Sequence, residues 1–278
     1  MGGLIAVNGS TGQLGGRIAR LISASGAHQR LLVRDPSRVP RLPHSEAEPV
    51  DLTDASGTRR QLAGVDTFVF VSLPESKYRA RQQVSVIEAA AAAGVQRVVY
   101  VSFVGAAPDC TFTFGRDHWH TEQAIVGSGM EFVILRNNFY QDVLVHFGGP
   151  DGVIAGPAAQ GRVAAVARDD SAAAIAAAAL DDSRTGQTYT LTGPEALTMA
   201  EVAALITEVT GKPTTYKAET FDEAYDSRAQ YGAEAWEVEG WVSSYASIAN
   251  GETALVTTDV EMLVGKPPRS FRDFLANQ

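Results

Sequence analysis

Leu4-Ile-Ala-Val-Asn-Gly-Ser-Thr-Gly-Gln-Leu-Gly-Gly16 is the stretch of sequence that decides the fold. Residues 4–7 have the apolar pattern of a short buried strand, and residues 17–22 carry apolar side chains at a helical period. Between them, glycines follow the spacing G-x-x-G-x-x-G, at Gly9, Gly12 and Gly15. In dinucleotide folds such a turn lets the backbone approach a pyrophosphate that faces the helix N-terminus. We therefore predict nucleotide binding, although a glycine-rich turn without a ligand has the same spacing.

Composition and charge restrict the class of protein. The 278 residues suffice for one large domain or two small ones with a sizeable core. The net charge of -9 argues against a general nucleic-acid binder, because neutralising phosphates requires clustered Lys and Arg. The single cysteine, Cys110, excludes an internal disulfide and a cysteine-based zinc site. It fits a reducing compartment, and we see no signal peptide or membrane-spanning apolar run, so we expect a cytoplasmic protein that binds no membrane.

The first half of the chain alternates between strand and helix patterns. Strands are expected at residues 4–7, 30–33, 48–51, 67–71, 97–102 and 132–135. Helices are expected at 17–22, from Asp54 as N-cap to about 62, at 79–93 up to Gly94, and at 117–126. This alternation predicts an α/β fold with a Rossmann doubly wound parallel sheet and right-handed crossovers.

The pattern changes after residue 151. Short strands are expected at 152–156, 162–166, 188–191 and 214–217, and helices at 221–231 and 235–248. Asp169 or Asp170 is expected to cap an Ala-rich helix that ends at Leu180, and Thr198 with Glu201 to form a capping box. We predict an NAD(P)-binding Rossmann domain over residues 1–151. Residues 152–278 form a smaller mixed α/β substrate-binding part that shares a strand or helix with it.

Arg34 stands at the end of the second expected strand, where the adenosine ribose of a bound dinucleotide lies in this fold. An Arg there pairs with the 2′-phosphate of NADP, whereas an acid binds the 2′-hydroxyl of NAD. Asp35 lies 20 residues after Gly15, where an NAD-selecting acid falls, but its position before Pro36 indicates the start of a turn. We favour NADP(H) over NAD(H), with Arg38 adding positive charge.

Polar side chains follow three later strands. Ser72-Leu73-Pro74 and Ser102 stand at strand ends that face the expected nicotinamide, although a strand-end serine also satisfies local backbone. After the sixth strand, amides at Asn137 and Asn138 are suited to bind a carboxamide or ribose, and Phe139 and Tyr140 to wall a flat ring. The alternative for this last segment is a capped helix with a buried Phe.

The Tyr-x-x-x-Lys proton-transfer pair of ordinary short-chain dehydrogenases is absent. The residues four positions after Tyr78, Tyr100 and Tyr140 are Gln82, Val104 and Leu144, and the other tyrosines fail the same test. This absence counts against a sugar epimerase or an ordinary alcohol dehydrogenase of that type.

His118 is the candidate for proton transfer in the polar cluster at residues 115–122. His120 lies two positions further, so on a helix the two rings diverge and do not suit one metal ion. We expect no metal site. The alternative for His118 is a helix-start histidine bonded to backbone.

Several motifs occur together: Gly-Ser-Thr-Gly-Gln-Leu-Gly at 9–15, Val-Arg-Asp-Pro at 33–36, Ala-Gly-Val at 93–95, His-x-x-Thr-Glu at 118–122, Leu-Arg-Asn-Asn-Phe-Tyr at 135–140 and Tyr-Thr-Leu-Thr-Gly-Pro-Glu-Ala-Leu-Thr at 189–198. Their combination resembles the NmrA-like branch of the atypical short-chain dehydrogenases. Within the branch the chain is most similar to bacterial NADPH-dependent quinone oxidoreductases and triphenylmethane reductases, over nearly its whole length.

The resemblance implies NADP(H) and direct hydride transfer without the Tyr/Lys pair. It places residues 9–14 at the pyrophosphate, Arg34 at the 2′-phosphate, and residues 72–74 and 137–142 on the nicotinamide side; His118 stands where relatives that reduce phenylpropanoids carry a Lys. The cofactor-binding residues expected are Gly9, Ser10, Thr11, Gly12, Gln13, Leu14, Arg34, Ser72, Leu73, Pro74, Ser102, Asn137, Asn138 and Phe139. The catalytic candidates are His118 and Tyr140.

These observations favour an NADPH-dependent oxidoreductase that transfers hydride to a flat conjugated acceptor, such as a quinone or a polyaromatic compound. A delocalised π system accepts hydride without a strong general acid. The branch also contains regulators that bind the dinucleotide and reduce nothing, so an NADP(H) sensor is the alternative. A specialised biosynthetic reductase or isomerase is the third. We expect a small aromatic or quinone-like substrate, and a monomer or homodimer.

Overall fold

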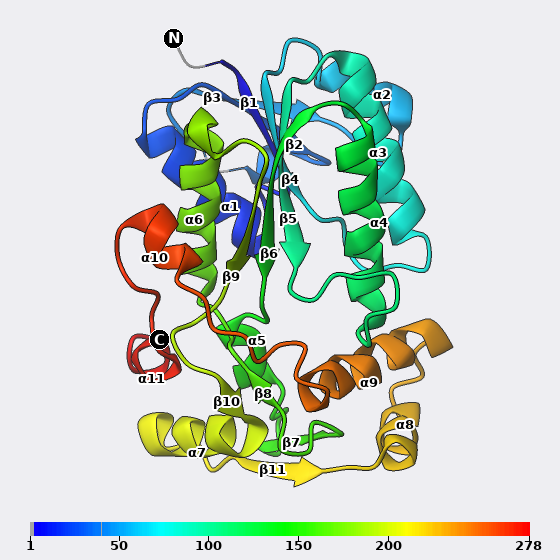
Figure 1. Cartoon of the computed structure of the whole chain (residues 1–278), viewed down its shortest axis with the longest axis vertical. Helices are drawn as coiled ribbons and strands as arrows, with labels where there is room; N and C mark the ends of the chain where they lie inside the picture. The colour runs from blue at the N-terminus through cyan, green and yellow to red at the C-terminus, as the bar shows by residue number, and fades with distance from the viewer. Residues whose placement is uncertain (1–2, 40) are drawn as a thin grey trace. The chain divides into compact units, whose positions relative to one another are not determined.

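A seven-stranded sheet forms the centre of the fold, in the order β3-β2-β1-β4-β5-β6-β9 (Figure 1). The computed structural model describes residues 3–39 and 41–278. All pairings from β3 to β5 are parallel. The strands are β1 (Ile5–Asn8), β2 (Gln29–Val33), β3 (Ser45–Pro49), β4 (Thr67–Val71), β5 (Arg97–Phe103), β6 (Glu131–Asn137) and β9 (Gln187–Leu191). The strand order reverses beside β1, which makes the sheet doubly wound and confirms the predicted Rossmann-like α/β class.

Helices cover both faces of this sheet. Figure 1 shows α1 (Gln13–Ala24) and α6 (Arg168–Leu180) on one face, and α2 (Ala55–Gln61), α3 (Arg79–Ala93) and α4 (Thr113–Gly127) on the other. Inside, Phe68, Phe70 and Tyr100 are fully buried, with ring centroids 5.3 and 5.5 Å apart along the series. The inner strands β1 and β4 are mainly apolar because helices exclude water from both faces of the sheet there.

The chain divides into two compact units whose segments alternate along the sequence. Unit 1 contains residues up to 102, 117–136 and 171–189, and unit 2 contains residues 103–116, 137–170 and 190–278. The functional division after residue 151 stays a prediction.

Unit 2 is a mixed α/β body with two small sheets. In one, β7 (Val153–Gly156) pairs in parallel with β11 (Thr215–Ala218); in the other, β8 (Arg162–Val163) pairs antiparallel with β10 (Leu197–Thr198). Its other helices are α5 (Gln141–His146), α7 (Met199–Thr210), α8 (Phe221–Ala229), α9 (Ala235–Ala249), α10 (Asp259–Val264) and α11 (Phe271–Ala276). A core that includes Ile154, Met199 and Phe271 joins β7 and β8 to α5, α7, α9 and α11.

Local start and stop signals in the sequence match the observed boundaries. The strand predicted at 67–71 is β4, and Gly94 ends α3 in the left-handed conformation at φ +86°. The predicted capping box is present, because Thr198 and Glu201 bind each other's backbone at the start of α7. These signals act within a few residues and need no tertiary context.

Other boundaries differ from the prediction. Helix α4 begins at Thr113, earlier than expected. Gly115 disfavours a helix in a prediction from sequence, yet it lies in the first turn of α4. Glycine is needed there because a Cβ would lie 2.8 Å from the Cys110 sulfur. Asp169 and Asp170 lie in the first turn of α6 and do not cap it, which corrects the prediction. The strand expected at 162–166 is only β8, and we predicted neither α10 nor α11.

Two short helices and one buried arginine connect the larger elements. The helices are 3-10 helices, η1 (Pro36–Arg38) and η2 (Asp182–Arg184). The arginine is Arg97, the first residue of β5. Its buried side chain donates to the carbonyls of Ala179 at 2.7 Å and Asp181 at 3.1 Å, and so joins the end of α6 to the sheet.

We expect Arg97→Met to lower the free energy of unfolding by about 3 kcal/mol, because it leaves these two carbonyl acceptors without donors. Urea unfolding followed by circular dichroism measures the change. Asp182→Asn is the matched control: its carboxylate pairs with the same guanidinium but is 92% exposed, so we expect little change. Equal losses in the two variants would contradict this assignment.

Candidate functional site

The glycine loop after β1 brings the start of α1 against the strand end. Gly9 adopts φ +68°, in the left-handed region, and its carbonyl accepts from the Gly12 N–H at 2.8 Å. A Cβ on Gly15 would lie 2.4 Å from the same carbonyl oxygen, so only glycine fits. Asn8 fixes the loop from the other side, because its amide both donates to and accepts from the Val71 backbone at 2.7 Å.

The N-terminus of α1 suits an anion. Its N-cap is Gly12, whose backbone is extended and offers no side-chain cap, and the first turn of this fully described helix carries no acidic residue. The first backbone N–H groups and the positive end of the helix dipole therefore lack a competing carboxylate. The loop and helix together fit the pyrophosphate of a dinucleotide.

A cleft of about 340 Å³ opens in unit 1 next to this loop. It lies at the carboxyl ends of β1, β2, β3 and β4, next to the segments that follow these strands. Five of the predicted cofactor residues line it: Gly9, Thr11, Arg34, Leu73 and Pro74. Others of unit 1 do not line it, namely Ser10, Gly12, Gln13, Leu14, Ser72 and Ser102.

Arg34 and Asp35 differ in what their side chains do. Arg34 is exposed and lines the cleft. Asp35 caps η1, accepting from the Ser37 N–H at 3.0 Å and its hydroxyl at 2.7 Å. These bonds lower the pKa of the Asp35 carboxyl. The interpretation of Asp35 as the start of a turn is confirmed, which leaves Arg34 at the cleft.

Sequence reasoning missed the segment after β3. Asp51 and Thr53 line the cleft, together with Glu75 and Ser76 from the segment after β4 and Gln82 from α3. The Thr53 backbone N–H and hydroxyl bind the Asp51 carboxylate at 2.9 and 2.8 Å and lower its pKa, and Arg34 acts in the same direction. The available signal was position alone: the second segment follows β4, which pairs with β1, and the first follows β3, which is separated from β1 by β2.

His118 is buried in a hydrogen-bonded network of unit 1. An Arg79 guanidinium donates to its Nε2, so Nδ1 carries the hydrogen that meets the Tyr100 hydroxyl at 2.9 Å. Burial, and then the Arg79 charge, hold the pKa of His118 well below its usual value. Gln83 links this network to the cleft, because it contacts Tyr100 and accepts from the Leu73 N–H at 2.8 Å.

These contacts favour a positioning role for His118. A proton donor at neutral pH needs a pKa near that pH and access to the reacting atom. His118 is 6% exposed and neutral, and both ring nitrogens are engaged. Its predicted catalytic role stays a prediction.

Ser102 also lies in a buried network. Its hydroxyl donates to Glu122 at 2.6 Å, and Arg136 binds both oxygens of the same carboxylate, at 2.9 and 2.5 Å. A side-chain partner, and not local backbone, therefore satisfies this serine.

The remaining predicted residues belong to unit 2. The Asn138 amide donates to the Thr253 carbonyl at 2.8 Å, and Phe139 packs on Phe103 with ring centroids 5.0 Å apart. Both amide atoms of the buried Asn137 lack a hydrogen-bond partner within residues 3–39 and 41–278. A buried amide in this condition fits a polar ligand group.

Tyr140 is covered by a cation. The Arg168 guanidinium lies 4.0 Å from its ring centroid and pairs with Asp142 at 3.0 Å. Burial raises the pKa of Tyr140 to about 12, which keeps its hydroxyl protonated near neutral pH.

The part of the chain that the structure describes lacks two further kinds of feature. No group of three or more His, Cys, Asp or Glu side chains there is arranged to hold a metal ion. No helix there is long and apolar enough to cross a bilayer.

The NmrA-like family matches residues 1–238 of the chain. An NAD(P)H azoreductase from Xenophilus azovorans is 29% identical over 276 residues, covering 98% of this chain and 96% of that protein. The NADPH-dependent quinone oxidoreductase of Escherichia coli, complexed with NADPH, has a TM-score of 0.91 at 26% identity, covering 98% and 99% of the two chains. The Citrobacter sp. triphenylmethane reductase complexed with NADP(H) has a TM-score of 0.85 at 26% identity, covering 99% of each.

The buried His118 predicts how stability depends on pH. The unfolded chain binds a proton on this side chain near its usual pKa, whereas the folded chain does not, so protons favour unfolding. We expect the free energy of unfolding to fall as the pH drops below about 6.5, by at most about 1.4 kcal/mol per pH unit from this group.

Urea unfolding at several pH values tests this dependence. His118→Gln keeps an acceptor for Arg79 and does not titrate, so its slope should be smaller than that of the unmodified chain. His120→Gln, an exposed position on the same helix, should keep the original slope. An unchanged slope in His118→Gln would show that this histidine does not control the dependence.

Proposed function

The chain belongs to the NmrA-like family, and we propose that it is an NADPH-dependent oxidoreductase that transfers hydride to a flat conjugated acceptor, such as a quinone or a polyaromatic compound. We further propose that it acts in the cytoplasm, as a monomer or homodimer. The cleft of unit 1 carries the proposal, because it combines a glycine loop, an uncapped helix N-terminus and an exposed arginine. Relatives named as an azoreductase, a quinone oxidoreductase and a triphenylmethane reductase support it.

Different residues of unit 1 would bind different parts of the dinucleotide. Residues 9–14 would hold the pyrophosphate through backbone N–H groups, since the loop leaves no room for side chains at Gly15. Arg34 would pair with the 2′-phosphate by charge-assisted hydrogen bonds. Leu73 and Pro74 would form a wall of the cleft. The Gln83 side chain holds this wall in place, because it accepts a hydrogen bond from the Leu73 backbone N–H.

On the nicotinamide side we propose Ser72, Ser102 and the segment from Asn137 to Phe139. The unpaired amide of Asn137 is the group best suited to a carboxamide. Bound NADPH would supply the hydride. The protein's own groups would bind and orient, because neither His118 nor Tyr140 has a pKa near neutrality. Water is then the proton source for a reduced acceptor.

The state of His118 and Tyr140 also favours a second candidate function. A regulator that senses NADP(H) needs the cleft but no acid or base, and the predicted catalytic side chains of this chain are neutral and engaged in internal contacts. Acceptor-dependent turnover separates the two functions. A specialised biosynthetic reductase or isomerase stays a prediction.

We expect Arg34→Glu to weaken NADPH binding by about 30-fold and NADH binding by about threefold or less, because only NADPH carries the 2′-phosphate. Fluorescence titration of the reduced nicotinamide measures both affinities. Arg59→Glu is the matched control, since Arg59 is exposed on α2 and does not line the cleft. Equal losses for the two dinucleotides would defeat the 2′-phosphate assignment.

We expect NADPH to be oxidised in the presence of simple quinones and triarylmethane dyes, because their delocalised rings accept hydride without a general acid. Loss of absorbance at the reduced-nicotinamide band measures the rate for each acceptor. The Arg34→Glu protein at the same NADPH concentration serves as the control and should be slower. Tight NADPH binding with no acceptor-dependent oxidation across the panel would favour the sensor.

A further inference from the structure

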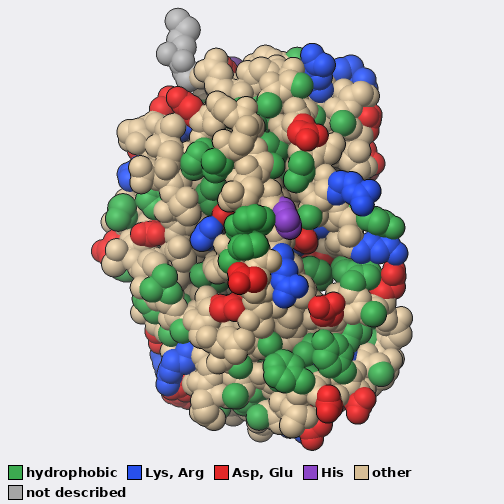
Figure 2. Space-filling view, turned by 45° about the vertical axis from the view of Figure 1, so that its right-hand side comes forward, with side chains coloured by type: hydrophobic (Ala, Val, Ile, Leu, Met, Phe, Trp, Pro, Cys, Tyr) green, Lys and Arg blue, Asp and Glu red, His purple; other side chains and the backbone are tan. Residues whose placement is uncertain are grey.

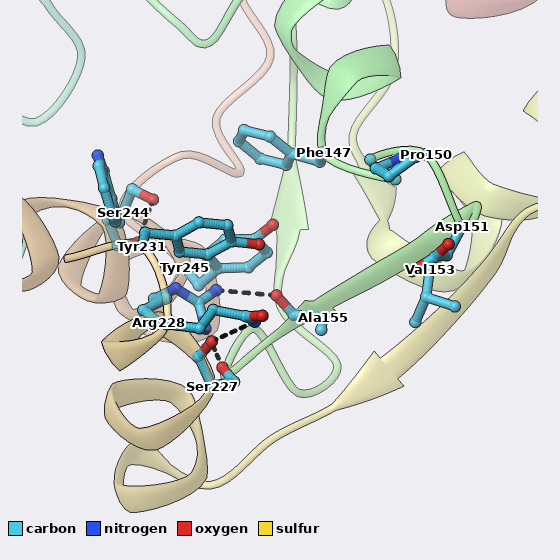
Figure 3. A pocket seen from close by; sticks show the side chains of 14 residues that line it. Phe147, Pro150, Asp151, Val153, Ala155, Ser227, Arg228, Tyr231, Ser244 and Tyr245 are labelled. Atoms are coloured by element: carbon cyan, nitrogen blue, oxygen red, sulfur yellow. Dashed lines mark hydrogen bonds between the residues drawn. The ribbon is translucent and has the colours of Figure 1, made fainter. Parts of the chain in front are cut away.

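Unit 2 contains a cavity of about 350 Å³ that shares no lining residue with the cleft of unit 1. Strand β7, helices α8 and α9 and the segment after α5 surround it (Figure 3). Cavities of this size accommodate small molecules. No residue predicted from the sequence as part of the cofactor site lines it.

Aromatic rings form much of the wall. Phe147 and Tyr245 pack with centroids 5.1 Å apart, and Tyr231 meets Trp241 edge to face at 6.1 Å. Tyr231 and Trp241 are 68% and 36% exposed. Figure 3 shows Phe147, Tyr231 and Tyr245 on one side of the space and Asp151 on the other. These faces offer a flat ring large apolar contacts.

Tyr245 is held rigidly in this wall. A Cβ on Gly156 would lie 2.5 Å from the tyrosine ring, so the missing side chain lets the ring rest on β7. The Arg228 guanidinium lies 5.4 Å from the ring centroid. The whole residue is 6% exposed, so its orientation is set before any ligand arrives.

The Tyr245 hydroxyl is an available donor. It lines the cavity, and within the described part of the chain no side chain or carbonyl accepts a hydrogen bond from it. Burial raises the pKa of this hydroxyl, which therefore stays protonated across the physiological range. Because Tyr245 lines the cavity, its hydroxyl can donate to a ligand that brings a hydrogen-bond acceptor.

Arg228 does not offer an anion site. Its guanidinium donates to the Glu219 carboxylate at 2.9 Å and to the Ala155 carbonyl at 2.9 Å, and both charged side chains are buried. The positive charge beside the cavity is thus neutralised by a partner already present.

The surroundings are acidic. Residues 219–239, which include α8 and the start of α9, contain seven acidic residues and one basic residue. Asp151 adds a carboxylate to the lining. Figure 2 shows acidic side chains at the lower end of its view, beside apolar ones. Lys212 donates to the carbonyl of the lining residue Gly149 at 3.2 Å, but the acidic side chains outnumber it, and their field disfavours anions that approach the cavity.

We propose that this cavity is a binding site for a flat aromatic molecule that carries an uncharged hydrogen-bond acceptor, such as a conjugated carbonyl, and that it rejects anionic analogues. The ring lies against Tyr231 and Trp241, and the acceptor takes the hydrogen of the Tyr245 hydroxyl. The site stands independently of the proposed redox activity, because nothing in it requires a dinucleotide.

Equilibrium dialysis with three probes tests the site: 9-fluorenone, fluorene, which has the same rings without the carbonyl, and 9-fluorenone-2-carboxylate. We expect fluorenone to bind more tightly than either of the others. Tyr245→Phe, which removes only the hydroxyl, should weaken fluorenone about fivefold and leave fluorene unchanged. Tyr225→Phe is the matched control, because Tyr225 is on α8 but does not line the cavity.

Asp151→Asn tests the rejection of anions, and it should strengthen binding of the carboxylate about threefold without affecting fluorenone. The proposal is overturned if Tyr245→Phe leaves the affinity for fluorenone unchanged or weakens fluorene equally, or if the unmodified chain binds the carboxylate as tightly as fluorenone. NADPH binding, measured in parallel by fluorescence, reports on the cleft of unit 1, so failure of the proposed function gives a different result.

Discussion

The close approach of α1 to the end of β1 is the constraint on which the arrangement of the candidate site depends. A Cβ on Gly15 would overlap the Gly9 carbonyl, so the strand-to-helix turn exists in this form only with glycine there. Asn8 joins the same strand end to β4 through both backbone groups of Val71. The helix N-terminus and neighbouring strand ends therefore keep one geometry, and the cleft follows from it.

Buried polar groups act over longer sequence distances. Arg97 binds backbone carbonyls of a segment more than 80 residues later, and Glu122 holds both Ser102 and Arg136. Arg228 and Glu219 form a comparable pair in unit 2. An unpaired buried charge is costly, so each group requires its partner in place. Side chains of types that are common in active sites therefore stabilise the fold here.

This use of polar residues bears on the chemistry. His118 and Ser102 combine residue types and positions common in active sites, yet their hydrogen bonds are made inside unit 1. The groups left without such partners are different: the exposed Arg34, the buried amide of Asn137 and the hydroxyl of Tyr245. They are suited to recognition of ligands, which fits the proposed role of bound NADPH as the source of the hydride.

The sequence by itself determined the α/β class, the glycine turn, the ends of β4 and α3, and the α7 capping box. Each depends on steric or hydrogen-bonding preferences within a few residues. Only the tertiary structure decided the start of α4, the place of Asp51 in the cleft and the state of His118. The partners of His118 lie 39 and 18 residues away along the chain, and a local pattern carries no information about contacts at such separations.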